Sequence, residues 1–340
     1  MHAELVVPSL LPRLDAQQIP LQFPPMPALE LLLARGRRTP GGRTSYEQWM
    51  AAACGHGADG QLPAGALTLL AEGGTPGDAV WMRADPVHLR LGRTDLRLVP
   101  AAAFGPSAEE CASLAASLNC HFAGELEFFA VNPFHWCVRV AAAPRFTAPS
   151  TAAVAGRDVN ANLPLGVDAK HWHARLNEIQ MLLHRHPANQ AREARGAPEV
   201  NSLWFWGAGP VPAARELGWQ SVSSDEPVAR GLALGSGGRA QRLPDSAAAW
   251  LAQLPEHGRH LVVLDALRLP LALGEHAAWT GRLAEMELKW FAPLLEALRK
   301  GRIGMLTLHL PDGREAISCE TVRRDLRCLW RRTRPLQAYA

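Results

Sequence analysis

His186–Gly209 reads HPANQAREARGAPEVNSLWFWGAG, and it is the most informative stretch of the chain. Its first half is polar and compatible with a helix, and its second half is an aromatic strand that ends in Gly-x-Gly. Trp204 and Trp206 are two residues apart, so in a strand they point to the same face. Gly207 and Gly209 allow a sharp turn or a close approach of the backbone to a ligand. The stretch therefore predicts a helix, a strand and a tight turn in succession.

The spacing of polar and aromatic residues in this block resembles that of the archaeal-type, cofactor-independent phosphoglycerate mutases, which belong to the alkaline-phosphatase superfamily. That family has a His-x-x-Asn-x-x-Arg run, then a Gly and an Asn, before a Trp-x-Trp-Gly-x-Gly strand. The matching positions here are His186, Asn189, Arg192, Gly196, Asn201 and Trp204–Gly209. The resemblance implies an alkaline-phosphatase-like α/β core, with a mostly parallel sheet and helices on both faces, and an inserted antiparallel α+β subdomain.

A sharper resemblance is carried by three segments, Arg83–Leu89, Leu176–Glu178 and Trp204–Gly209. They are similar to those of a proteobacterial group usually labelled phosphoglycerate-mutase-like proteins or "regulatory protein, RpfE type". This group is a divergent, bacterial relative of the mutases, and its label carries a regulatory association without a defined reaction. The resemblance therefore implies a superfamily and a regulatory role rather than a particular substrate.

The composition is that of a globular chain. Of the 340 residues, 48% are hydrophobic and 20% are charged, and the net charge of +3 is too small to indicate nucleic-acid binding by the whole chain. No apolar run reaches the ~18 residues of a membrane span. The run Leu5–Leu11 lacks the basic leader and cleavage site of a signal peptide. The six cysteines form no C-x-x-C pair, which favours reduced thiols. We therefore expect a cytoplasmic protein with no membrane partner.

Two hairpins on either side of one helix predict the inserted subdomain. Trp81–Val99 and Leu126–Val140 have the alternation and turns of hairpins. Between them, Ser107 and Glu110 form the capping box of a helix that ends near Ala123. The predicted boundaries are residues 79–140 for the subdomain, and residues 1–78 and 141–340 for the alkaline-phosphatase-like core.

Outside this subdomain, strands and helices alternate. Strands are predicted at Leu5–Leu11, Asn201–Trp206, His260–Asp265 and Met305–Leu310, and a long helix is predicted at His276–Lys300. This alternation is typical of a mostly parallel sheet that is covered on both faces.

The mutase family transfers phosphoryl groups with two divalent metals, held by Asp and His side chains at strand ends, and with a Ser or Thr nucleophile. Two cations together stabilise the attacking and the leaving oxygen. This chain departs from that pattern at three strand ends. Ser9 stands where the family has an aspartate. Asp265 is present, but Arg268 and Leu269 follow where the family has a histidine. The last core strand ends in Leu-His309 rather than Asp-His.

Ser9, Asp265 and His309 are therefore candidate remnants of a catalytic site. One carboxylate and one imidazole do not make a two-metal centre. We expect no metal and no cofactor, and an active enzyme would require two divalent metals, Mn or Zn, with further ligands supplied by loops.

A second set of polar residues is predicted to line a ligand cleft: Arg83, Asp85, His88, His186, Asn189, Arg192 and Asn201. Arg83 and Asp85 face the same way on a strand, so they either pair with each other or share a polar ligand. The Arg192 guanidinium is suited to two-pronged phosphate binding, and Asn189 adds an amide donor. The alternatives are a structural ion pair for Arg83 and Asp85, and helix capping and packing for Asn189 and Arg192.

The C-terminal segment is basic, since residues 321–340 contain six arginines and one acid. On a helix, Arg323, Arg327 and Arg331 form one i, i+4 stripe. One interpretation is a solvated terminal helix whose apolar residues, among them Trp330, face the core. The other is a docking surface for nucleic acid, an acidic protein or another anion.

Three functions follow from these observations. The first is a catalytically degenerate relative that keeps a cleft for a phosphorylated metabolite or another anion, or binds a protein partner, and has a regulatory role. The second is an active, metal-dependent, 2,3-bisphosphoglycerate-independent phosphoglycerate mutase or phosphatase with an altered metal site. The third is a nucleic-acid accessory protein that uses the basic C-terminus. The departures at three strand ends favour the first, in which the protein is not an enzyme.

Overall fold

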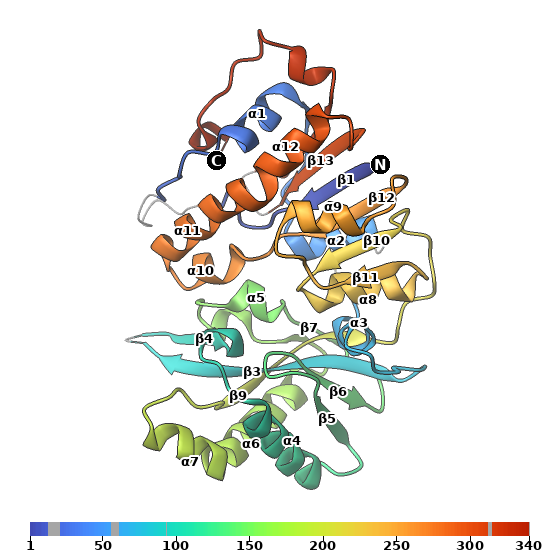
Figure 1. Cartoon of the computed structure of the whole chain (residues 1–340). Helices are drawn as coiled ribbons and strands as arrows, with labels where there is room; N and C mark the ends of the chain where they lie inside the picture. Colours follow the sequence, from blue (N-terminus) through green and yellow to red (C-terminus); the bar gives the residue numbers. More distant parts are fainter. Residues whose placement is uncertain (13–20, 56–60, 93, 312–314, 340) are drawn as a thin grey trace. The chain divides into compact units, whose positions relative to one another are not determined.

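The computed structural model describes residues 1–12, 21–55, 61–92, 94–311 and 315–339. The chain forms two compact units (Figure 1), unit 1 from Met1–Gly60 with Ala214–Ala340, and unit 2 from Gln61–Ala213. Unit 2 is thus an insertion into unit 1. It is wider than the predicted subdomain of residues 79–140, because one helix before that range, and helices and a strand after it, pack on the same sheet.

Unit 1 is built on a seven-stranded sheet. In spatial order its strands are β11 (Arg239–Gln241), β10 (Ser221–Ser224), β12 (Arg259–Val263), β1 (His2–Val6), β13 (Met305–Leu310), β14 (Ile317–Val322) and β2 (Arg37–Pro40). The strands from β11 to β13 are parallel, β14 is antiparallel to β13, and β2 is antiparallel to β14. The mostly parallel α/β architecture predicted from the sequence is confirmed.

The helices of unit 1 are α1 (Pro27–Arg35), α2 (Tyr46–Ala53), α8 (Pro227–Gly235), α9 (Ala247–Gln253), α10 (Arg268–Ala272), α11 (His276–Met286) and α12 (Ala292–Arg299). Helices α1, α9, α11 and α12 pack on one face of the sheet, where they form the main hydrophobic core with strand residues such as Leu5, Val262 and Leu308 (Figure 1). Along β1, Ala3 and Leu5 belong to this core, so His2 and Glu4 point to the opposite face.

The predicted long helix His276–Lys300 is present but contains a π-helical turn, η3 (Glu287–Phe291), between α11 and α12. Pro293 has no N–H to donate, so the regular hydrogen-bond ladder is interrupted just after this turn. The turn positions the Glu287 carboxylate to accept hydrogen bonds from the N–H groups of Ala28 (2.6 Å) and Leu29 (3.3 Å) at the start of α1. The irregularity therefore caps a neighbouring helix.

Unit 2 is built on an antiparallel sheet. Its strands are, in spatial order, β4 (Leu96–Pro100), β3 (Val80–Leu91), β6 (Trp136–Val140) and β5 (Leu126–Ala130), with β9 (Ser202–Gly209) paired to β3, and β7 (Phe146–Thr147) and β8 (Leu165–Gly166) forming a separate pair. Its helices are α3 (Ala64–Ala71), α4 (Ala108–His121), α5 (Thr151–Val154), α6 (Ala169–His184) and α7 (Pro187–Ala194). Both predicted hairpins are confirmed, and so is the capping box of α4, formed by Ser107 and Glu110.

The strand predicted at Asn201–Trp206 exists as β9, but its placement in the parallel core was wrong, because β9 pairs antiparallel with β3. Leu203 and Phe205 pack in the core formed with α4 and α6, whereas Trp204 and Trp206 belong to a cluster on the other face. Alternation along the strand explains both faces, but it carries no information about the partner strand.

Gly207 has φ of 64°, and a Cβ there would lie 2.5 Å from the Cβ of Ala64. The close approach that the glycines permit is therefore made to α3 and not to a ligand.

The predicted terminal helix does not form. After β14, the described residues 323–339 contain only two short 3₁₀ turns, η4 (Asp325–Arg327) and η5 (Leu336–Tyr339). Arg323, Arg327 and Arg331 therefore form no helical stripe, and Trp330 is 77% exposed rather than in the core. Arginines spaced four apart repel one another along a helix, and Arg331 instead donates to the carbonyl of Arg35 at the end of α1 (2.6 Å).

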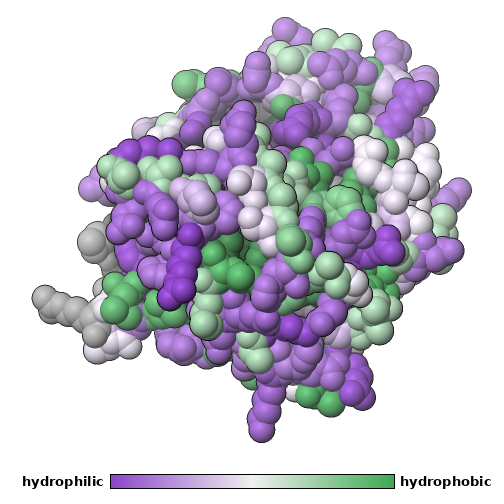
Figure 2. Space-filling model, turned by 90° about the horizontal axis from the view of Figure 1, so that it is seen from below, coloured by the Kyte–Doolittle hydropathy of each residue, from purple (hydrophilic) through white to green (hydrophobic). Residues whose placement is uncertain are grey.

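The face in Figure 2 is mostly hydrophilic, with green hydrophobic areas interrupted by purple residues. Within the described ranges, no helix has the length and apolarity needed to cross a membrane.

Candidate functional site

The carboxyl ends of the parallel strands in unit 1 hold the candidate site, as is general for open α/β sheets. Ser9 follows β1 and is nearly buried, with φ of 60°. This left-handed conformation is costly for a residue other than glycine, by roughly 1–2 kcal/mol. The indole N–H of Trp279 on α11 donates to the Ser9 carbonyl (3.1 Å) and so helps to hold it. Ser9 thus occupies a constrained turn at the end of β1.

Asp265 follows β12 and begins the turn into α10. Its carbonyl accepts from the backbone N–H of Arg268 (3.0 Å), which places the two side chains in one short turn. Burial raises the pKa of the Asp265 carboxyl to about 6. The Arg268 guanidinium opposes this rise, whereas the nearby carboxylates of Glu226 and Asp225 add to it.

The start of α2 covers this cluster. Arg268 Nη2 donates to Glu47 Oε1 (2.5 Å), and the Arg268 guanidinium lies 4.8 Å from the centre of the Tyr46 ring. The Tyr46 hydroxyl donates to Glu226 Oε2 (3.4 Å). Burial, and then the charge of Glu226, raise the pKa of Tyr46 well above its usual value. The cluster is therefore a partly buried group of carboxyls organised around one guanidinium.

Tyr46, Glu47 and Glu226 were not predicted from the sequence. The available signal was the Glu226-Pro227 pair, which is typical of a helix start. In the structure, Glu226 accepts from the backbone N–H groups of Val228 (3.0 Å) and Ala229 (2.9 Å) as the N-cap of α8.

His309 belongs to a different cluster, on the polar face of the sheet. Its Nδ1 is 2.9 Å from Ser318 Oγ, its Nε2 is 3.7 Å from Glu4 Oε2, and its ring centre is 4.9 Å from that of Trp49 on α2. No hydrogen bond or ion pair joins His309 to Asp265 or Ser9, all three of which lie in the described part of the chain. The three candidate remnants therefore do not form one hydrogen-bonded set.

Glu4 is the centre of this second cluster, and the sequence analysis missed it. Its carboxylate accepts from Trp219 Nε1 (3.0 Å) and Arg259 Nε (2.7 Å), and it is 3% exposed. Burial alone would raise the pKa of Glu4, but the contacts with His309, Trp219 and Arg259 outweigh it and lower the pKa to about 2. The available signal was a glutamate directly before the apolar residues Leu5, Val6 and Val7.

Glu4→Gln is expected to destabilise the protein by about 2 kcal/mol at neutral pH. The pKa of Glu4 is lower in the folded state than its usual 4.5, so the carboxylate contributes stability above that value. This contribution is lost as the pH falls from about 4.5 to about 2. Urea denaturation across this range measures the effect, and equal stability differences at pH 7 and pH 3 would contradict it.

The residues at the carboxyl edge do not fit a two-metal centre. Ser9 contributes a hydroxyl and not a carboxylate. Asp265 has a raised pKa and lies beside Arg268, a fixed cation, and His309 is committed to Glu4 and Ser318. Among the residues that the structure describes, no three His, Cys, Asp or Glu side chains are grouped so that they could hold a metal.

In unit 2, Arg83 and Asp85 form a buried ion pair, each with 3% of its side chain exposed. Asp85 Oδ1 accepts from Arg83 Nε (2.8 Å) and Nη2 (2.5 Å), and Arg83 Nη1 donates to Thr68 Oγ1 (3.0 Å). Asp85 Oδ2 accepts from Thr151 Oγ1 and from Trp206 Nε1, the latter at 2.9 Å. The geometry favours the structural ion pair over a shared ligand.

Asn189 and Arg192 on α7 also form hydrogen bonds with other residues of this chain. The Asn189 amide, fully buried, donates to the carbonyls of Leu183 (2.9 Å) and Val200 (2.8 Å) and accepts from the N–H of Val200 (3.0 Å). Arg192 donates through all three nitrogens, to Pro198 O (2.6 Å), Glu110 Oε2 (2.6 Å) and Phe104 O (3.0 Å). The sequence left open a ligand-binding role and a capping and packing role for these two residues, and the structure favours packing.

The remaining predicted ligand residues make local structural contacts. Asn201 forms a pair of hydrogen bonds with the backbone of Leu89 (2.7 and 3.0 Å), and His88 Nδ1 is 3.0 Å from Glu199 O. His186 is the N-cap of α7, and its Nε2 is 2.9 Å from Ser117 Oγ. The segment that resembles the mutases therefore builds the framework of unit 2.

Comparisons with known proteins agree with this fold. No family model and no curated protein matches the chain. Among solved structures, it is similar to a cofactor-independent phosphoglycerate mutase from Thermoplasma acidophilum DSM 1728, with 16% identity, a TM-score of 0.50, and coverage of 94% of this chain and 89% of that one. It is also similar to the PH0037 protein from Pyrococcus horikoshii, with 11% identity, a TM-score of 0.58, and coverage of 94% and 87%.

The protein is therefore an α/β protein with a mostly parallel core sheet and a separate antiparallel sheet. More particularly, its fold is phosphoglycerate-mutase-like.

Proposed function

We propose that this protein is a catalytically degenerate, phosphoglycerate-mutase-like protein that acts by binding and not by phosphoryl transfer. The observation that carries the proposal is the placement of Arg268 beside Asp265 at the carboxyl edge of the sheet. A guanidinium supplies positive charge to an anion, but it cannot bind and activate a nucleophile as a metal ion does. Arg268 is therefore the group through which this edge would bind an anion, which would replace Glu47 as the partner of the guanidinium.

A phosphorylated small molecule is the ligand class that we assign to this edge. Ligands of open α/β sheets bind outside the carboxyl ends of the strands, and arginine is well matched to phosphate oxygens. The resemblance to the proteobacterial "regulatory protein, RpfE type" group supports a regulatory role, in the cytoplasm of a bacterium. The Arg268 side chain, partly buried against Tyr46, is the cation that we expect to contact the ligand.

The test is a calorimetric titration with 3-phosphoglycerate and, separately, with inorganic phosphate, both in the presence of EDTA. The unmodified protein is expected to bind without metal. Arg268→Gln is expected to weaken binding at least about tenfold, the effect of one charged hydrogen bond. Arg282→Gln, which removes an equal charge from an exposed position on α11, is expected to bind as the unmodified protein does. Equal affinity in Arg268→Gln and Arg282→Gln would remove Arg268 from the site.

The alternative is an active, metal-dependent phosphoglycerate mutase or phosphatase. It is favoured by the Asp265 carboxyl, whose pKa of about 6 suits proton transfer near neutral pH. Elemental analysis after incubation with Mn²⁺ and Zn²⁺, followed by a mutase assay, separates the two functions. We expect neither stoichiometric metal nor turnover. About two metals per chain, with turnover lost in Asp265→Asn, would establish the enzyme and end the binding proposal.

A further inference from the structure

A groove with a volume of about 850 Å³ lies along β2, the edge strand of unit 1, four strands from β12 in the sheet. It is formed by the end of α1, by β2 and β14, and by the segment that follows η4. The side chains that give it its character are Arg37, Arg38, Arg331, Arg332, Arg334 and Trp330. None of these belongs to the clusters around Asp265 and Glu4.

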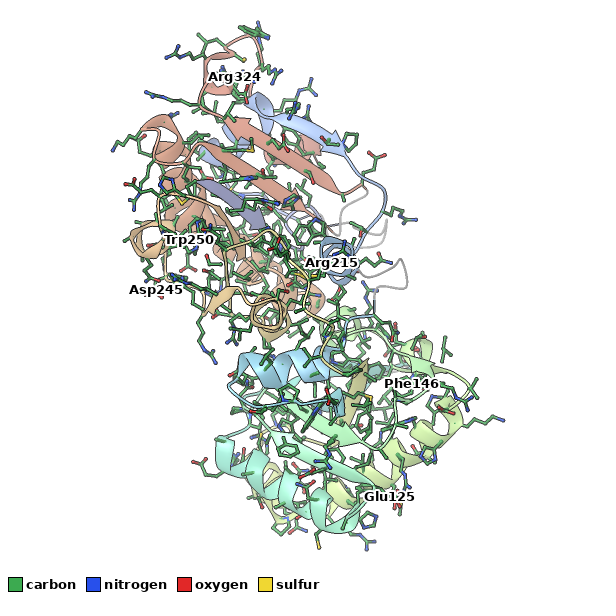
Figure 3. All side chains as sticks on the ribbon, turned by 90° about the vertical axis from the view of Figure 1, so that its right-hand side faces the viewer. Glu125, Phe146, Arg215, Asp245, Trp250 and Arg324 are labelled. Atoms are coloured by element: carbon green, nitrogen blue, oxygen red, sulfur yellow. The ribbon has the colours of Figure 1, made fainter. Side chains whose placement is uncertain are left out.

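The groove is strongly basic, since the described residues that line it include five arginines and one acid, Glu315. Arg37 is paired with Glu320 on β14 (2.5 Å), at an exposed position. Arg332 and Arg334 are exposed and have no hydrogen bond or ion pair among the described residues. Among the described residues of the groove, positive charge therefore exceeds negative charge. Figure 3 shows Arg324 in the same C-terminal segment, where many side chains extend from the ribbon and end in nitrogen.

The groove is also aromatic. Trp330 is 77% exposed, so a large apolar ring faces solvent beside the arginines. Tyr339 lines the same groove, and the Arg38 guanidinium lies 5.2 Å from its ring centre. An isolated exposed ring needs no explanation, but an exposed indole within a basic groove provides a flat surface for stacking.

The C-terminal segment is not helical, but hydrogen bonds anchor it before and after Arg332 and Arg334. Before them, Arg35 Nη1 donates to Leu326 O (3.4 Å), and Arg331 Nη1 donates to Arg35 O (2.6 Å). After them, the backbone N–H of Leu336 donates to Glu30 Oε1 (3.0 Å), and the Leu336 side chain is buried. The residues between these anchors are thus held at the groove.

We propose that this groove binds single-stranded nucleic acid, with Arg332 and Arg334 contacting phosphates and Trp330 stacking on a base. Proteins that bind single strands combine a positively charged groove with aromatic side chains in this way, and arginine holds phosphate oxygens in two-pronged fashion. Asp265 follows β12, which is four strands from β2, so the groove is a separate site from the one proposed above and can be tested independently.

The concave shape and the ring favour a single strand over other anionic partners. A lipid bilayer is broad and does not enter a groove that is only about 850 Å³ in volume. An acidic peptide matches the charge, but its acidic residues carry no ring, whereas every nucleotide carries a base that can stack on Trp330. A duplex has its bases stacked on one another, so their faces are not available to an indole.

Fluorescence anisotropy with a labelled oligothymidylate of ~12 nucleotides tests the proposal. The full chain is expected to bind with an affinity that falls as salt rises. The double variant Arg332→Gln/Arg334→Gln is expected to lose about tenfold or more in affinity, and the slope of log affinity against log salt is expected to be smaller by about 1.4, for two phosphates. The matched control, Arg282→Gln/Arg299→Gln on α11 and α12, removes the same charge from exposed positions and is expected to change little.

An abasic strand of the same length tests the stacking contact. Trp330→Ala is expected to lose about tenfold in affinity for oligothymidylate and to bind the abasic strand as the unmodified protein does. All substituted residues are exposed, so thermal melting is expected to be unchanged. The proposal is overturned by absent or salt-insensitive binding, or by an equal effect of Trp330→Ala on both strands. Tighter binding of polyglutamate, or of phosphatidylserine vesicles, would also overturn it.

Discussion

Arg192→Ala is expected to destabilise the protein by about 3–5 kcal/mol, because it removes one side of a buried ion pair. Only 2% of the Arg192 side chain is exposed, and each of its nitrogens donates to a protein acceptor. Alanine would remove the donor from the carbonyls of Phe104 and Pro198. It would leave Glu110, 14% exposed, with Arg195 as its remaining ion-pair partner.

Urea denaturation at neutral pH measures this effect, and Arg195→Ala is the matched control. Arg195 also pairs with Glu110, but its side chain is 52% exposed, so its removal is expected to cost less than about 1 kcal/mol. The ligand role predicts the reverse, a stable Arg192→Ala variant that no longer binds phosphate. An unchanged denaturation midpoint together with lost phosphate binding would therefore restore Arg192 to a binding site.

The role of Arg192 could not be predicted from the sequence, because two of its hydrogen-bond partners are distant in the chain. The capping box of α4 was predictable because Ser107 and Glu110 are three residues apart, and the hairpins were predictable from alternation within short segments. The partners of Arg192 on α4 and beside it are 82 and 88 residues away in the chain. A local pattern shows that an arginine and an asparagine are suitably spaced for a ligand. It does not show that other parts of the chain already satisfy them.

The same limit applies at the carboxyl edge of the parallel sheet. Asp265 was placed correctly at the end of a strand, since it follows a short apolar run. The strand predicted at Leu5–Leu11 was displaced, because β1 spans His2–Val6 and Ser9 lies beyond its end. The separation of His309 from Asp265 depends on which face of the sheet each side chain occupies and on what covers it. Glu4 became central only because β1 lies between β12 and β13, an order that no single segment encodes.

Asp85→Asn is expected to cost about 3–5 kcal/mol, for a reason that differs from a simple loss of contacts. The substitution keeps the shape of the side chain but removes its charge, so the Arg83 guanidinium becomes an unpaired charge at a position that is 3% exposed. Thr151 and Trp206 both donate to Oδ2 of Asp85, so an asparagine NH₂ group at that position would face both donors, since it cannot accept a hydrogen bond. Thermal and urea denaturation measure the loss.

A double-mutant cycle separates the ion pair from its surroundings. If the cost of Asp85→Asn comes mainly from the unpaired, buried Arg83 charge, then the double variant Arg83→Met/Asp85→Asn should lose less stability than the sum of the losses in the two single variants. If Arg83 and Asp85 instead formed part of a ligand cleft, water or the ligand would solvate Arg83, and Asp85→Asn would cost less than about 1 kcal/mol. A small cost of that kind, with additive single variants, would contradict the structural assignment. A large, non-additive cost would mean that the Arg83–Asp85 pair helps to hold unit 2 together.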